Sequence, residues 1–299
     1  MMRHIFLLLL YIILSNRITK AADTQEGDSL AKQQHESCMR HIAALNLSNH
    51  TYNVIVELGC STAKMSHKLA QKYPEKLYIA IDSDAKAIAQ ATERCKDQPN
   101  IICINDTMQL YNLQAYNLPP ADITTCYHLL HWIEQKELPT VFFNIAKNLA
   151  PHGIIDISTP TKQEQCAITR ATQDTLLFKQ EWSQYSLPFL THATKAQENI
   201  SYISIEELTK LATNAHLQVL LCEKRQESYL FKSQEEFKSF LHSCLKHYGL
   251  EHCMGRGIQL KFIKDIAKRY CKNYNQSEDQ KLIEYSFSSL HLTGQKIES

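Results

Sequence analysis

The sequence predicts an α/β protein built on a mostly parallel sheet, and three observations lead to that prediction. Short β-branched apolar runs at 54–56, 77–81 and 101–104 alternate with segments of helical periodicity. The turn after the first run contains Gly59, and the second run ends at Asp82. A strand, a tight turn, a helix and a second strand that ends in an acid form half of a nucleotide-binding site.

The remaining segments continue this alternation toward the carboxyl end. Helices are expected over 30–47, 64–73, 84–96, 139–149, 204–215, 233–245 and 262–270, and further strands over 121–127, 154–158, 217–221, 228–231 and 286–294. Ser204 and Ser233 each precede a glutamate by three positions, which is the spacing of a capping box at a helix start. The last strands predict a closing antiparallel pair, a feature that most dehydrogenases lack.

The turn and the acid favour a nucleoside ligand without a pyrophosphate. Asp82 at the end of its strand is expected to accept both hydroxyls of a ribose. A dinucleotide site requires glycines spaced G-x-G-x-x-G, and this turn contains Gly59 alone. S-adenosyl-L-methionine (SAM) has no phosphate, so its binding requires fewer glycines in the turn. A dehydrogenase, which would bind a dinucleotide here, is therefore the less favoured alternative.

Five motifs follow one another at suitable separations. They are ELGCSTA at 57–63, AIDSD at 80–84, INDTMQL at 104–110, TCYHLLHWI at 125–133 and LAPHG at 149–153. With these motifs the chain resembles the class I SAM-dependent methyltransferases over roughly 34–297. It is most similar to the small-molecule carboxyl methyltransferases typified by the trans-aconitate and juvenile-hormone-acid enzymes. The resemblance implies a Rossmann-like, seven-stranded, mostly parallel sheet with an antiparallel carboxyl-terminal strand and a helical lid.

The resemblance also implies which residues bind SAM. These are Glu57, Gly59, Cys60, Ser61, Ala63, Asp82, Ser83, Asp106, Thr107 and Tyr127. In this family Glu57 meets the methionine end of the cofactor, whereas Asp106 and Thr107 meet the adenine. Ser61 and Ala63 stand where the family usually has glycine, which allows a positive φ and close approach to the ligand. The alanine adds one methyl group, which the turn tolerates if φ there is negative. The serine departs further from the pattern, because in this family the backbone at its position faces the methionine part of SAM.

The acceptor side needs orientation more than proton transfer. A carboxylate is already an anion at pH 7, so methyl transfer to it requires placement in line and in a dry site. The resemblance implies that Trp132 orients the acceptor, that His131 supports it, and that Gln34 on the first helix reaches the acceptor carboxylate. Packing of both rings in the core is the alternative reading. His128 and His131 have the spacing of metal ligands on a helix but no third partner, so no metal is expected.

We expect the chain to consist of four segments. Residues 1–22 resemble a signal peptide or an anchor, 23–160 form the SAM-binding half, 161–203 a helical lid, and 204–299 complete the same domain. The 299 residues carry a net charge of +1, which disfavours a nucleic-acid partner. The apolar run 5–14 predicts membrane association or export, whereas ten cysteines without a C-x-x-C pair suggest a reducing compartment. Localisation and oligomeric state therefore stay open.

The predicted function is SAM-dependent methyl transfer to a small-molecule acceptor, with a carboxylic acid and a methyl ester product favoured. One alternative is a malonyl-carrier-protein-type O-methyltransferase, because 129–132 fits that group too. Another is a non-catalytic SAM-binding or interaction protein on a degenerate methyltransferase fold, which Ser61 and Ala63 suggest.

Overall fold

The computed structural model describes residues 28–45, 47, 52–161, 167–189, 202–246, 249–275, 277 and 282–297. The segment expected to be a signal or anchor, 1–22, lies outside the described residues. The chain divides into two compact units. Unit 1 contains residues 1–34, 160–200 and 226–288, and unit 2 contains 35–159, 201–225 and 289–299.

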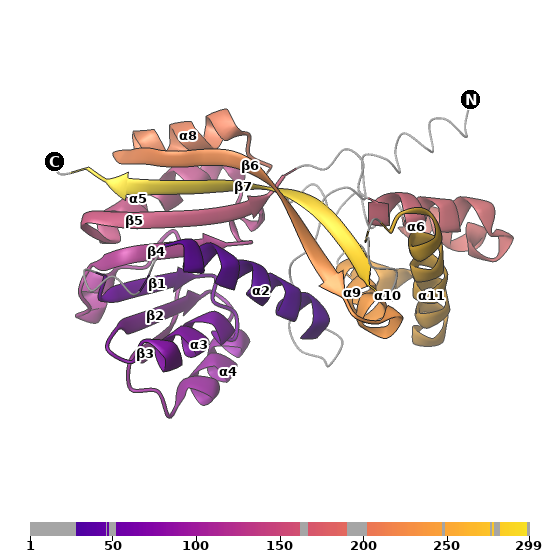
Figure 1. Ribbon diagram of the computed structural model, residues 1–299, viewed down its shortest axis with the longest axis horizontal. Coiled ribbons are helices and arrows are strands. Elements are labelled where there is room, and N and C mark those ends of the chain that lie inside the picture. Colours follow the sequence, from indigo (N-terminus) through magenta and orange to yellow (C-terminus); the bar gives the residue numbers. More distant parts are fainter. Residues whose placement is uncertain are drawn as a thin grey trace. The chain divides into compact units, whose positions relative to one another are not determined.

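A seven-stranded sheet carries the fold, in the order β3-β2-β1-β4-β5-β7-β6 (Figure 1). The strands are β1 Val54–Leu58, β2 Leu77–Asp82, β3 Ile101–Asn105, β4 Ala121–Tyr127, β5 Leu149–Pro160, β6 Leu217–Phe231 and β7 Ile283–Lys296. The first five strands pair in parallel, and β7 runs in the opposite direction to β6 (Figure 1). This arrangement confirms the predicted fold class, including its antiparallel strand near the carboxyl end.

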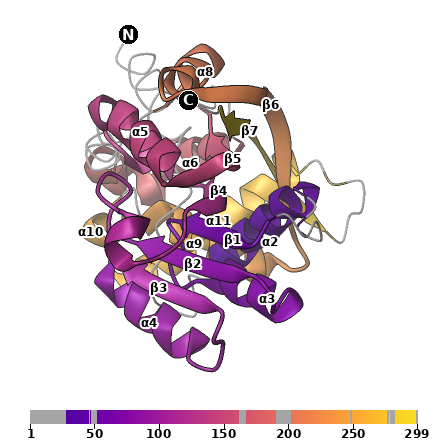
Figure 2. The ribbon, with the colours of Figure 1, turned by 90° about the vertical axis from the view of Figure 1, so that its left-hand side faces the viewer.

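Helices cover both faces of the sheet in unit 2, because successive side chains of a strand point to opposite faces. The helices are α2 Asp28–Ala44, α3 Lys64–Lys72, α4 Ala85–Cys95, α5 Leu138–Asn148 and α8 Ile205–Asn214. Ile42 of α2 and Met65 of α3 pack with Ile55, Tyr78 and Ile123 on one face. The helices α5 and α8 pack on the alternate strand residues of the other face (Figure 2).

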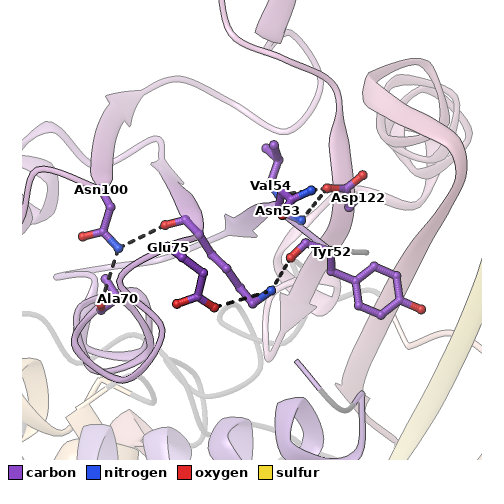
Figure 3. Close-up of polar contacts among 8 residues, drawn as sticks. Tyr52, Asn53, Val54, Ala70, Glu75, Asn100 and Asp122 are labelled. Carbon is purple, nitrogen blue, oxygen red and sulfur yellow. Dashed lines mark hydrogen bonds and ion pairs between the residues drawn. The ribbon is translucent and has the colours of Figure 1, made fainter. Parts of the chain in front are cut away.

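The amino ends of the strands are held together by polar contacts (Figure 3). Asp122 Oδ2 accepts hydrogen bonds from the backbone N–H groups of Asn53 at 2.7 Å and Val54 at 2.9 Å. The side chain of Lys76, only 1% exposed, donates from Nζ to the carbonyl of Tyr52. These contacts fix the entry into β1 and β2 at the edge opposite to the candidate site.

Unit 1 has its own aromatic core, built by α6 Ala167–Phe178, α9 Gln234–Lys246, α10 Leu250–Cys253 and α11 Arg256–Asn273, with a short 3-10 turn at Gln180–Trp182. The ring of Trp182 packs against that of Phe262 with centroids 5.0 Å apart, and the Trp182 indole N–H donates to Asp265 Oδ2 at 2.9 Å. Such contacts join two stretches of unit 1, 160–200 and 226–288, which residues 201–225 of unit 2 separate in the sequence.

This division differs from the one expected. We expected residues 204–299 to complete the domain of the sheet, but 226–288 group with 160–200. The physical reason is that the aromatic side chains of α9 and α11 bury themselves against α6 and against the ends of β6 and β7 that belong to unit 1. The 161–203 segment is helical over 167–178, and its residues 162–166 and 190–201 lie outside the described part.

Two further predictions can be compared with the structure. The capping box is confirmed at α8, where Ser204 Oγ accepts from the Glu207 N–H at 3.1 Å and the Glu207 carboxylate accepts from the Ser204 N–H at 2.9 Å. The strands expected at 217–221 and 228–231 are instead one strand, β6. Among the described helices, none combines the length and the apolar character that crossing a bilayer requires.

Candidate functional site

The sheet order places a topological switch point between β1 and β4. From β1 the chain proceeds to β2 on one side, and β4 is followed by β5 on the other. Ligands of open α/β sheets bind beyond the carboxyl ends of the strands at such a point. The turn 59–63 follows β1 directly, and Asp82 and Asp106 lie at the ends of β2 and β3. The structure therefore brings the three predicted cofactor motifs to one edge.

The turn keeps a glycine-like backbone although it contains one glycine. Gly59 has a φ of +73°, Ser61 of +49° and Ala63 of +52°. The condition under which alanine would fit without strain, a negative φ, is therefore not met at Ala63. Ala63 is the N-cap of α3 and takes the left-handed conformation there, whereas an N-cap residue is usually extended. For residues other than glycine this conformation costs about 1–2 kcal/mol each. The surrounding fold therefore holds Ser61 and Ala63 in a conformation that both residues disfavour.

Asp82 ties the turn to the end of β2. Its Oδ2 accepts a hydrogen bond from the Ser61 N–H at 2.8 Å, and its Oδ1 accepts from the Asp84 N–H at 2.9 Å. The exposed Ser83 lies between these two aspartates. Each carboxylate oxygen has a second lone pair, so Asp82 can accept two further donors such as the hydroxyls of a ribose.

Gly59 and Cys60 hold the turn against β2 through their backbones. Their N–H groups both donate to the carbonyl of Ile81, at 2.8 and 3.1 Å. A Cβ atom on Gly59 would lie 2.6 Å from Leu129 Cδ2 and would displace that side chain, and the positive φ adds backbone strain to any such substitution. Burial raises the pKa of the Cys60 thiol well above its ordinary value, and the charges of Glu57 and Asp82 add to this effect. The thiol therefore stays protonated.

Glu57 lies in the centre of the sheet, in register with Ala80 of β2 and Thr125 of β4. One carboxylate oxygen accepts from the Ser66 N–H at 3.1 Å and from the Ser66 hydroxyl. Burial raises the pKa of Glu57 to about 7, with a smaller contribution from Asp82, although the Ser66 hydrogen bonds oppose the shift. The group therefore changes charge near neutral pH.

Asp106 joins the end of β3 to the same edge. Its N–H donates to the Asp82 carbonyl at 3.2 Å, and its Oδ1 accepts from the Thr107 N–H at 2.7 Å. Its Oδ2 accepts from the hydroxyl of Tyr116 at 2.8 Å, and this hydrogen bond raises the Tyr116 pKa. Sequence reasoning missed Tyr116, because nothing in the motif pointed to a residue ten positions later.

Tyr127 ends β4, but its side chain turns inward. The hydroxyl donates to Asp156 Oδ2 at 2.6 Å, and the ring stacks on His41 of α2 with centroids 5.4 Å apart. The structure thus places Tyr127 at the predicted edge with its hydroxyl already bonded within the protein. A role toward the cofactor stays a prediction for this residue.

The residues predicted for the acceptor side lie on α2 and in the short turn Leu130–Trp132 that follows β4. His131 is fully buried, and its ring lies against that of the half-buried Trp132 with centroids 4.8 Å apart. Both belong to unit 2, next to Leu129, which covers Gly59. Gln34 lies on α2, the helix that continues into unit 2 from His35 onward, and its role toward the acceptor stays a prediction. Within the described ranges, no cluster of three or more His, Cys, Asp or Glu side chains is arranged to hold a metal ion.

Comparison with known proteins agrees with this geometry. Residues 55–153, from β1 into β5, match the family of the methyltransferase domain. The chain is a class I SAM-dependent methyltransferase. It is similar to the trans-aconitate 2-methyltransferase of Deinococcus radiodurans, with 21% identity over 196 residues that cover 60% of this chain and 69% of the relative.

Solved structures share the fold of this methyltransferase at low sequence identity. A Bacillus halodurans protein assigned as a methyltransferase has a TM-score of 0.53 and 8% identity, and the match covers 88% of this chain and all of the other. A Galdieria sulphuraria protein assigned as a sarcosine dimethylglycine methyltransferase has a TM-score of 0.51 and 12% identity, over 95% and 93% of the two chains. These likenesses concern the architecture.

The residues at the switch point fit SAM, the methyl donor of the class I methyltransferases. Asp82 presents a carboxylate that the turn already orients, and Glu57 presents a second, partly buried one. Ser61 is exposed, and its backbone N–H keeps the hydrogen bond to Asp82. The left-handed conformations at Ser61 and Ala63 preserve the course of a glycine-rich turn.

Proposed function

We propose that this methyltransferase transfers the methyl group to a carboxylate of a small organic acid and so forms a methyl ester. The observation that carries the proposal is the similarity to the trans-aconitate 2-methyltransferase, which extends over 196 residues and thus beyond the methyltransferase domain itself. A carboxylate acceptor also suits a site that positions its ligands, because the nucleophile is an anion before it binds.

Each predicted residue then has a distinct task. Bound SAM supplies a methyl group activated by the adjacent sulfonium. Asp82 accepts the ribose hydroxyls with the lone pairs that Ser61 and Asp84 leave available. Glu57, in its ionised form, accepts from the ammonium of the methionine end, and Asp106 with Thr107 receives the adenine.

On the acceptor side we assign Trp132 to orientation. Its indole N–H donates to the reacting carboxylate, and the buried ring of His131 behind it restricts the indole to one orientation. A neutral donor suits this task, because it positions the oxygen without neutralising the charge that makes it a nucleophile.

A labelled methyl group tests the proposal directly. The protein is incubated with methyl-labelled SAM and a panel that contains tricarboxylic, dicarboxylic and monocarboxylic acids, phenols and amines, with trans-aconitate among the acids. Mild base releases labelled methanol from a methyl ester but leaves methyl ethers and methyl amines intact. We expect base-labile label on at least one acid. Transfer confined to phenols or amines would refute the carboxylate acceptor.

The positions of Ser61 and Ala63 favour a second candidate, a SAM-binding protein without turnover. Both residues occupy left-handed positions that the family fills with glycine. Under this alternative, calorimetry would detect binding of SAM or of its demethylated product, S-adenosylhomocysteine, while the whole acceptor panel stayed unlabelled. A requirement for an acyl-carrier partner would instead indicate the carrier-protein methyltransferases.

A further inference from the structure

A buried polar cluster lies in unit 2 and is not used by the roles assigned so far. Asp156 of β5 is fully buried, and its Oδ2 accepts from the Tyr127 hydroxyl at 2.6 Å. Its Oδ1 lies 2.9 Å from His291 Nε2 and accepts from the Thr293 hydroxyl at 2.8 Å. The ring of His41 lies against those of Tyr127 and His291, with centroids 5.4 and 4.9 Å away.

The hydrogen bonds in this cluster favour a charged Asp156. Burial alone would raise its pKa, but the contacts with His291, Tyr127 and Thr293 outweigh burial and lower it. An ionised carboxylate accepts from His291 Nε2–H. The second ring nitrogen, Nδ1, is then available to a different partner.

The cluster reaches the carboxyl edge of the sheet beside the candidate cofactor site. Thr125 is in register with Asp156, and Tyr127 with Ser158. Ser158 therefore lies on the same face as Asp156, two residues nearer to the edge. Strands are about 4.8 Å apart, and β4 alone separates β5 from β1. The end of β5 is thus roughly 10 Å from the turn after β1, a span that a bound cofactor and acceptor can bridge.

Two atoms of this cluster have no hydrogen-bond partner among the described residues. They are Ser158 Oγ and His291 Nδ1. Ser158 is 0% exposed and His291 3% exposed, so water does not readily compensate for the missing partners. A buried polar atom without a partner costs about 1–3 kcal/mol. Two of them in one cluster at a ligand-binding edge indicate a polar ligand.

We propose that Ser158 and His291 bind a second, non-reacting carboxylate of the acceptor, so that this methyltransferase selects acids with at least two carboxylates. The inference rests on the proposed function. The Ser158 hydroxyl donates to one oxygen of that carboxylate, and Nδ1–H of His291 donates to the other. Asp156 holds the ring in place through Nε2.

Ser158 and His291 suit a carboxylate that does not take part in the reaction better than they suit the reacting one. A charge-assisted hydrogen bond is about twice as strong as a neutral one, and it would stabilise the negative charge of an attacking oxygen and slow its reaction. The same bond on a distant carboxylate fixes the position of the acid without that penalty. Binding energy from a remote group can be used to orient the reacting one.

The test compares Ser158→Ala, His291→Gln and His291→Ala with a matched control, Thr124→Val. Thr124 also has a buried hydroxyl without a partner among the described residues, but it alternates with Thr125 and so faces the other side of the sheet. We measure KM and kcat for the di-, tri- and monocarboxylic acids of the panel. Calorimetry adds the affinity of each acid for protein saturated with S-adenosylhomocysteine, and the affinity for that cofactor product itself.

We expect the wild-type protein to bind di- or tricarboxylic acids at least tenfold more tightly than monocarboxylic ones. Ser158→Ala and His291→Ala should weaken binding of the larger acids at least tenfold and leave monoacids and the cofactor product within twofold. His291→Gln keeps a donor and should recover part of the loss, and Thr124→Val should resemble the wild type. Thermal denaturation identifies a variant that fails to fold, and Ser158→Ala, the smallest change, then decides.

Two results would overturn the inference while the proposed function stands. One is a wild-type protein that methylates acids without preferring two carboxylates, and the other is an unchanged preference in Ser158→Ala and His291→Ala. A wild-type protein that methylates none of the acids refutes the proposed function and this inference together. The wild type alone reveals that case, so the two failures are distinguishable.

Discussion

The backbone N–H of Ser61 donates to Oδ2 of Asp82 at 2.8 Å, and this contact joins the turn after β1 to the acid after β2. Every residue except proline can provide this N–H group, so the contact does not depend on glycine at position 61. What glycine would supply is freedom to adopt a φ of +49° without cost. The turn can therefore depart from the family sequence and still orient its carboxylate.

Replacing Ser61 with glycine should stabilise the protein. The left-handed cost of about 1–2 kcal/mol disappears, and the greater freedom of glycine in the unfolded chain returns about 0.4–1 kcal/mol of it. We expect a net gain of roughly 0.5–1 kcal/mol in the free energy of unfolding, measured by urea denaturation. Ser61→Ala is the control, because it removes the hydroxyl but keeps the Cβ and should show no such gain. A less stable Ser61→Gly would contradict the strain.

Asp82→Asn should weaken cofactor binding without unfolding the protein. An amide has one acceptor oxygen, so it can serve only one of the two backbone N–H groups and fewer ribose hydroxyls. Loss of hydrogen bonds to a charged group, at about 1.5–3 kcal/mol each, predicts a rise of at least tenfold in the dissociation constant of S-adenosylhomocysteine, measured by calorimetry.

The neighbouring Asp84 offers the matched control. It caps α4 by accepting from the N–H groups of Lys86 and Ala87, a task that asparagine performs equally well. Asp84→Asn should therefore leave the free energy of unfolding unchanged and the dissociation constant of the cofactor product within twofold of the wild type. If the two variants lost affinity alike, the effect would come from the charge of the loop and not from the ribose contact.

Local pattern predicted the regular part of the fold. Each of the first four strands lies within two residues of its expected end, because short apolar runs bounded by turns leave little choice. The polar stretch between 221 and 228 suggested a break, yet β6 is continuous. It lies at the edge of the sheet, where side chains exposed to solvent need not alternate with apolar ones.

The parts that the sequence did not reveal depend on contacts between distant residues. Asp156 and His291 are 135 positions apart and meet because β5 and β7 are neighbours in the sheet. The one available signal was the pair of polar residues, Asp156 and Ser158, at alternate positions of an apolar strand. The positive φ of Ala63 also could not be predicted, because alanine has no intrinsic preference for the left-handed conformation that it takes at the start of α3.

Glu57 should make cofactor affinity depend on pH near neutrality. Its pKa of about 7 in the unliganded protein exceeds the ordinary 4.5 because burial disfavours the charge. The ammonium of the ligand requires the ionised form, so affinity for S-adenosylhomocysteine should fall as the pH drops below about 7. Calorimetry between pH 5.5 and 8.5 measures this, and Glu57→Gln removes the contribution. Parallel profiles for the two proteins would exclude Glu57 as the source.

The same shift has the opposite consequence for the unliganded fold. Because the folded protein binds this proton more tightly than the unfolded chain, the contribution of Glu57 to stability is fully present below pH 4.5. It is lost as the pH rises through about 7. The melting temperature of the wild type relative to Glu57→Gln should therefore decline over that interval. A difference that stays constant with pH would show that Glu57 titrates normally.

Removal of Asp122 should reduce stability and leave the site intact. Asp122 Oδ2 accepts from the N–H groups of Asn53 and Val54 at the amino end of β1 (Figure 3). Asp82 lies at the opposite end of the parallel strands, where β2 ends. Asp122→Ala leaves two backbone donors without this acceptor, and since water can reach the Asn53 N–H we expect a loss of roughly 1–3 kcal/mol in the free energy of unfolding. Asp122→Asn keeps one oxygen in place and should lose less. We expect a change at the amino ends of the strands to leave the residues at their carboxyl ends in place. Both variants should therefore bind S-adenosylhomocysteine like the wild type. A loss of affinity in Asp122→Ala that Asp122→Asn restored would show that entry into β1 also sets the geometry of the turn.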